Sequence, residues 1–70
     1  MRQYVVIYER GADGGWGAYL PDLPGVVAVG KSRGEVGARI KEALDAYVAD
    51  LRDRGDSLPA ALHDADVISA

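Results

Sequence analysis

Three carboxylates are the first residues to test for acid, base or metal chemistry in this chain: Glu9, Asp13 and Asp22. Nucleases that use two metal ions need several carboxylates that converge on one point, so that ions about 3.5 to 4 Å apart can be held. Here the three acids fall at predicted strand ends and loops, and none lies mid-strand opposite a helix carboxylate. We therefore predict no catalytic residue and no enzymatic activity.

The remaining reactive residue types are equally sparse. His63 is the single histidine and the chain has no cysteine, so neither a metal site nor a nucleophile paired with a base is predicted. The glycines of the stretch 11–17 precede a strand pattern instead of a helix, which excludes a phosphate-binding loop. We expect no cofactor, and we expect His63 to lie in a solvated loop.

The charge balance points away from nucleic acid as a direct partner. Eight basic and 11 acidic side chains give a formal net charge of −3, whereas a protein that binds nucleic acid by itself is usually basic. An acidic surface suits a basic protein partner. Taken alone, the charge is better explained by solubility than by a basic partner.

The length of 70 residues predicts one domain with a small core. Small domains rely on disulfides, metals or oligomerisation, and without cysteines we expect a homo-oligomer, either a dimer or a tetramer. The N-terminus passes from Arg2 directly into a strand pattern, with no secretory or membrane-length apolar run. A cytoplasmic location is expected.

Three strands are predicted in the first 30 residues. The run from Gln3 to Glu9 alternates with both faces apolar, which suggests that one face packs on a second subunit. Residues 16–20 form the return strand of a hairpin, with Trp16, Ala18 and Leu20 on one face. The stretch 23–26 has the proline and glycine of a type II turn, and the unbroken apolar run 26–29 predicts a third, mostly covered strand.

A helix follows, with a start signal, an apolar face and a stop signal. Ser32 can cap it and Glu35, three residues later, completes a capping box. Gly55 is suited to the left-handed conformation that ends helices. The apolar face comprises Val36, Ile40, Ala43, Leu44, Tyr47, Val48 and Leu51.

The tail from Ala65 to Ser69 is long enough for one short final strand. The order of elements is then βββαβ, and the crossover through the helix places the last strand parallel to a neighbour. The predicted fold class is α+β, with one helix packed on one face of a small mixed sheet.

Several motifs in this order resemble the HicB-like antitoxin family. The resemblance runs from the apolar opening strand at Tyr4 through the tail, and it rests on spacing more than on any single motif. The matching positions are Gly14-Gly15-Trp16, Pro21-Asp22-Leu23-Pro24-Gly25, Gly30-Lys31-Ser32 with Glu35, and Glu42-Ala43-Leu44. The departures are Lys31 where an acid is common, Gly34 in place of a helix former, and Arg39 where asparagine is frequent.

The resemblance implies a partial ribonuclease H-like fold and a role as an antitoxin. Such a protein binds a HicA-like toxin, a small basic RNA-cleaving protein, and covers its RNA-binding face. The resemblance suggests exposed loop and hairpin positions for this contact, namely Asp13, Trp16, Tyr19, Asp22 and Leu23. Trp16 and Tyr19 fit the core or a subunit interface somewhat better than a toxin contact. Asp22 fits a local turn hydrogen bond as well as it fits the toxin contact.

Many HicB-like proteins also carry a C-terminal DNA-binding module. We expect residues 1–70 to form a single domain that lacks this module, as a fragment or as a stand-alone form, so direct DNA binding is not expected. The alternative function is an orphan homo-oligomeric domain with a structural role or a small-ligand pocket. A gene for a small basic protein beside this one would favour the antitoxin.

Overall fold

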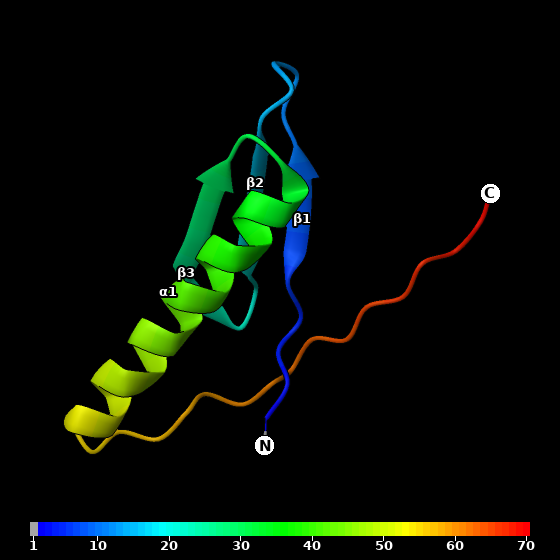
Figure 1. The fold of residues 1–70 in the computed structure, drawn as a ribbon. Helices are drawn as coiled ribbons and strands as arrows, with labels where there is room; N and C mark the ends of the chain where they lie inside the picture. Colours follow the sequence, from blue (N-terminus) through cyan, green and yellow to red (C-terminus); the bar gives the residue numbers. More distant parts are fainter. Residues whose placement is uncertain (1) are drawn as a thin grey trace.

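A three-stranded sheet covered by one helix forms the body of the protein. The computed structural model describes residues 2–70. Its elements are β1 (Ile7–Arg10), β2 (Trp16–Leu20), β3 (Leu23–Gly30) and α1 (Arg33–Asp53). The strands pair antiparallel in the order β1-β2-β3, and α1 lies across one face of the sheet (Figure 1). The predicted α+β class, with one helix on one face of a small sheet, is confirmed.

The core lies between α1 and the sheet face that it covers. Tyr8, Ala18 and Ala28 are register partners across the three strands, and all three contact the core cluster. Each large aliphatic side chain buried there contributes about 1.5 to 3 kcal/mol. The buried members of the cluster are Ala18, Leu20, Leu23, Val26, Val36 and Ile40.

Both ends of α1 follow the signals in the sequence. The Ser32 hydroxyl accepts a hydrogen bond from the amide of Glu35 at 3.1 Å, while the Glu35 carboxylate accepts one from the amide of Lys31 at 3.3 Å, one residue before the expected position. At the other end Gly55 has φ +73°. The amides of Gly55 and Asp56 donate to the carbonyls of Arg52 and Leu51, which is the Schellman arrangement.

The predicted type II turn at residues 23–26 is wrong. The chain reverses two residues earlier, at Pro21 and Asp22, and Leu23 already belongs to β3. The glycines with positive φ among residues 2–70 are Gly14 and Gly55, so Gly25 does not take the conformation that a type II turn needs. Instead, residues 24–26 fall at an irregularity in the β2–β3 pairing, where a proline without an N–H removes no regular ladder bond.

The third strand is covered on one face only, and not on both as the unbroken apolar run suggested. Val26 is buried and Ala28 is half-buried, whereas Val27 and Val29 are 61% and 70% exposed. Since α1 covers a single face, the alternate side chains of β3 project from the other. We call this second face, formed by the register positions 7, 9, 17, 19, 27 and 29, the open face of the sheet.

The two ends of the chain differ most from expectation. Residues 3–6 are not part of β1, although Tyr4 and Val6 pack against the core as predicted. The final strand at residues 65–69 is wrong: the tail forms no strand, and Val67 and Ile68 are 94% and 93% exposed. The sheet is therefore antiparallel throughout instead of mixed. A strand requires a neighbour that shares its hydrogen bonds, and the tail runs away from both sheet edges (Figure 1).

Candidate functional site

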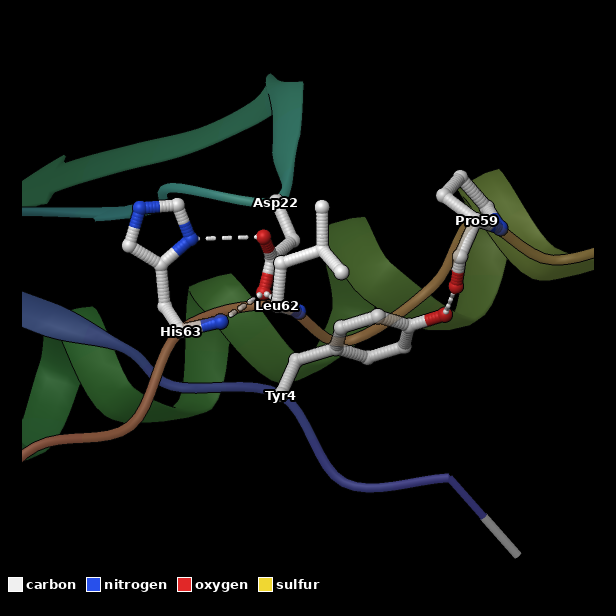
Figure 2. Close-up of polar contacts among 5 residues, drawn as sticks. All are labelled: Tyr4, Asp22, Pro59, Leu62 and His63. Atoms are coloured by element: carbon white, nitrogen blue, oxygen red, sulfur yellow. Dashed lines mark hydrogen bonds and ion pairs between the residues drawn. The ribbon is translucent and has the colours of Figure 1, made fainter.

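Asp22 lies in the turn between β2 and β3 and binds the C-terminal tail. Its Oδ2 atom accepts hydrogen bonds from the amides of Leu62 at 3.0 Å and His63 at 3.2 Å. Its Oδ1 atom lies 2.6 Å from Nδ1 of His63. Figure 2 shows the imidazole ring and the tail backbone converging on the carboxylate. The hydrogen bonds of Asp22 therefore join residues some 40 positions apart in the chain. The Asp22 side chain binds the tail instead of making the local turn hydrogen bond that the sequence suggested.

The environment of Asp22 favours its ionised form. The hydrogen bond from the His63 ring lowers the pKa of the carboxyl group, and the two backbone amides and the charge of the ring act in the same direction. Partial burial opposes them. The side chain of Asp22 is only 5% exposed, whereas that of His63 is 55% exposed. His63 is thus a surface residue, but it is not free in solvent as predicted, because it is paired with Asp22.

Asp13 lies at the other end of β2, in the β1–β2 hairpin loop. Its Oδ1 atom accepts a hydrogen bond from the amide of Gly15 at 3.0 Å. The amide of Gly11 donates to the carbonyl of Gly15 at 2.7 Å, and Gly14 has φ +88°, a conformation that favours glycine. The Asp13 side chain therefore orders its own loop while the residue remains exposed.

Trp16 begins β2 at the same end of the sheet. The ring is half-buried and packs against the core cluster, and the guanidinium carbon of Arg10 lies 5.9 Å from the ring centroid. Trp16 also lines an open groove, together with Glu9, Arg10 and Asp13. By register Glu9 projects from the sheet face opposite to α1, whereas Trp16 lies on the face that α1 covers, so the groove's carboxylates do not surround the ring. Of the two uses that the sequence left open for Trp16, packing against the core is the one found, and a partner contact stays a prediction.

Tyr19 and Leu23, the other two candidates, lie on opposite sides of the sheet. Tyr19 is on the open face, where its register partners are Ile7 and Val27. Leu23 is fully buried in the core, so the expectation of an exposed position is wrong for this residue. The reason is its place in β3 with its side chain beneath α1, since the chain has already reversed at Pro21 and Asp22.

The five candidates do not form one site. Asp13 and Trp16 lie at the hairpin end of β2, Asp22 and Leu23 lie at its other end, and Tyr19 is on the open face. The same separation keeps Glu9 and Asp13 apart from Asp22, and no group of three metal-ligating residue types converges within residues 2–70. Whether any of the five binds a partner stays a prediction.

Two features were missed by sequence reasoning. The first is the pairing of His63 with Asp22, for which 41 residues of separation leave no local signal. The second is the exposure of Val27 and Val29. A signal for it was present, because a strand packed beneath a single helix buries only every second side chain.

Comparison with known proteins decides the family. Residues 4–69 match the model of the family described as the HicB-like antitoxin of bacterial toxin–antitoxin systems. This chain belongs to the HicB-like antitoxin family. The UPF0150 protein Ta0767 of Thermoplasma acidophilum is 35% identical to it over 57 residues, which cover 81% of this chain and 83% of that protein.

No solved structure matches this HicB-like chain, so the partial ribonuclease H-like fold stays a prediction. Within residues 2–70, α1 falls short of the length and apolar character that a membrane-crossing helix needs.

Proposed function

We propose that this HicB-like protein neutralises a small, basic, RNA-cleaving toxin of the HicA-like kind by covering its RNA-binding face. The family assignment supports an antitoxin role, and the formal charge of −3 suits a basic partner. An acidic protein seated on a basic RNA-binding face excludes the phosphates of the substrate and is steered toward that face by its charge. This role is regulatory and not enzymatic, and it belongs in the cytoplasm, where the RNA is.

The groove at the hairpin end of the sheet is the proposed contact for the toxin. Glu9 and Asp13 supply two carboxylates to its lining, and the half-buried Trp16 lines the same groove. A lysine or arginine from a basic partner can pair with one of these carboxylates. This groove is the single observation on which the assignment of the contact rests.

Co-expression of the chain with a small basic protein encoded beside it tests the contact. We expect the two to co-purify, and we expect Glu9→Lys to weaken the complex by about tenfold or more, because it places a cation against a basic partner. Glu42→Lys is the matched control, since it makes the same charge change on the exposed side of α1. Equal affinity of both variants would remove the groove from the interface.

The open face of the sheet is the proposed contact between copies of the chain. Among its six register positions only Glu9 is charged, and Tyr19, Val27 and Val29 are exposed apolar residues. Two acidic chains repel one another least where neither carries charge. We therefore propose a dimer or tetramer assembled through this face, which also gives a small domain the additional burial that it needs.

Light scattering at micromolar concentration tests this assembly. We expect an oligomer for the native chain and a monomer for Val27→Asp, which puts a second charge on the open face. Ala46→Asp is the control, because Ala46 is exposed on α1. A monomeric native chain would refute the assembly without touching the toxin contact.

The second candidate function is an orphan homo-oligomeric domain with a structural or small-ligand role. The open apolar face favours it, because such a face serves self-association with or without a toxin. A folded oligomer that fails to bind the neighbouring basic protein would support this candidate over the antitoxin.

A further inference from the structure

A segment of the tail is fastened to the body at two places. After α1 ends, the chain turns back and passes beside the N-terminal residues (Figure 1). The hydroxyl of Tyr4 donates a hydrogen bond to the carbonyl of Pro59 at 2.6 Å, and Arg2 donates to the same carbonyl at 2.8 Å. Three and four residues further on, the amides of Leu62 and His63 bind Asp22. We call residues 58–63 the strap.

The polar contact at Asp22 is the stronger of the two fastenings. A nearly buried, ionised carboxylate accepts from two adjacent amides and lies against one ring nitrogen, so both of its oxygens are occupied. Hydrogen bonds to a charged group are stronger than those between neutral groups. At the other fastening the Tyr4 hydroxyl is neutral. The Arg2 guanidinium, which donates to the carbonyls of Pro59 and Leu58, is charged, but the residue is exposed and water weakens its bonds.

Apolar packing contributes little to holding the strap. Leu58 and Pro59 are half-buried, whereas residues 60–63 are exposed, and the side chain of Leu62 is 82% exposed. Segments with few buried apolar contacts open at low cost in free energy. The attachment of the strap therefore depends on its polar contacts and above all on Asp22.

The attachment ends at His63. The hydrogen bonds found beyond it run from the amides of Ala65 and Val67 to the side chains of Asp64 and Asp66, and so stay within the tail. Residues 64–70 are exposed throughout. Asp22 therefore sets where the tail leaves the body.

We propose that the strap is a releasable latch, in which Asp22 holds residues 58–63 against the N-terminal segment and its release frees both the tail and the turn carboxylate. While the latch is closed, both oxygens of Asp22 are engaged and its side chain is only 5% exposed, so a basic group of another molecule has little access to it. While it is open, the carboxylate at the end of β2 is accessible and residues 57–70 move independently of the body. The latch is a property of the chain by itself and does not rest on the proposed toxin.

Amide hydrogen exchange on the full chain, resolved by residue with NMR, tests the latch. In Asp22→Ala we expect the amides of Leu62 and His63 to exchange at least about tenfold faster, because both lose a charged acceptor. Amides in the β2–β3 pairing should be unchanged. Asp64→Ala is the control: it removes a carboxylate from the adjacent, unattached position and should leave Leu62 and His63 as they are.

A second variant keeps the test decisive if Asp22→Ala does not fold. His63→Ala removes the ring contact and leaves both amides in place, so we expect a smaller increase in exchange that is still confined to the strap. Unchanged exchange at Leu62 in a folded Asp22→Ala, or in His63→Ala if the former is unfolded, would overturn the proposal. Equal acceleration in Asp64→Ala would also overturn it, since it would assign the effect to the tail in general.

Discussion

The two loops that flank β2 each carry an aspartate, and their carboxylates are used in different ways. Asp13 accepts a hydrogen bond from the amide two residues later, so it shapes the loop to which it belongs. Asp22 accepts from residues 62 and 63, so it joins two parts of the chain that are far apart in sequence. Both residues are aspartates in loops next to β2. They differ because the C-terminal tail lies within hydrogen-bond distance of Asp22, whereas Asp13 binds its own loop.

The difference extends to how each end of the sheet is stabilised. The loop with Asp13 is exposed and held by its own hydrogen bonds. The turn with Asp22 is followed directly by Leu23, which is fully buried, and lies against the strap. One end of the sheet therefore depends on local backbone geometry and the other on the core.

The largest loss of stability should come from a substitution in the core next to the Asp22 turn. Leu23→Ala removes a fully buried side chain beside Leu20, Val26 and Val36, and we expect a loss of about 2 to 5 kcal/mol in the free energy of unfolding. Val27→Ala is the control on the open face and should cost well below that. Urea unfolding followed by circular dichroism measures both, and equal losses would contradict the placement of the core.

Substitutions at Gly14 and Gly34 should change the stability of the fold by a smaller amount. Gly14→Ala forces an L side chain into φ +88° and should cost about 1 kcal/mol. Gly34→Ala should have the opposite sign and stabilise by up to about 1 kcal/mol, because Gly34 lies in the first turn of α1 with open space around the added methyl group. Thermal unfolding compares the two, and a stabilising Gly14→Ala would show that the loop does not need the positive φ.

Removing the carboxylate of Asp13 in the hairpin loop should lower the free energy of unfolding by about as much as Gly14→Ala does. Asp13→Ala loses one hydrogen bond to the amide of Gly15 in an exposed loop, for which we expect about 0.5 to 1.5 kcal/mol. Asp13→Asn retains an acceptor oxygen and should recover part of the loss. Neither variant should alter exchange at Leu62 or His63, and a change there would mean that the two ends of β2 are coupled.

Acidification should affect the strap with the least change in global stability. The pKa of Asp22 is lowered from an ordinary value of 3.8, chiefly by the His63 hydrogen bond. Because the folded-state pKa lies below the unfolded one, the contribution of the carboxylate is complete above pH 3.8 and is lost as the pH falls through the lowered value. The other titratable or charged groups that bind the strap or follow it are Tyr4 and Arg2, which donate to the carbonyl of Pro59, and Asp64, which accepts from the amide of Ala65.

NMR shifts of the Leu62 and His63 amides follow this transition, with amides of β2 as a check that the fold persists. The transition should disappear in Asp22→Asn, which has no ionisable group at that position. A transition of the same amplitude in Asp22→Asn would assign it to another acid and contradict the role of Asp22.

Local signals made much of this fold predictable. The cap at Ser32, the stop at Gly55 and the hairpin return at Trp16 each depend on hydrogen bonds or backbone angles within a few residues. The apolar face of α1 follows from its spacing, and three of its members are fully buried. These features need no knowledge of the remainder of the chain.

The errors arise where distant segments decide the outcome. Pro24 and Gly25 fit a type II turn locally, but the pairing of Leu20 with Leu23 places them inside β3. The residues 65–69 have an apolar composition that allows a strand, but no sheet edge lies beside them to accept their hydrogen bonds. The pairing of His63 with Asp22 likewise becomes visible only when the tail is placed against the turn.

The central claim, that this HicB-like protein neutralises an RNA-cleaving toxin, is tested most directly by titrating the purified chain against the neighbouring basic protein in an RNA-cleavage assay. We predict that cleavage falls to background at a fixed ratio of the two proteins, and that the ratio matches the composition of their purified complex. Undiminished cleavage in the presence of excess folded chain would contradict the claim.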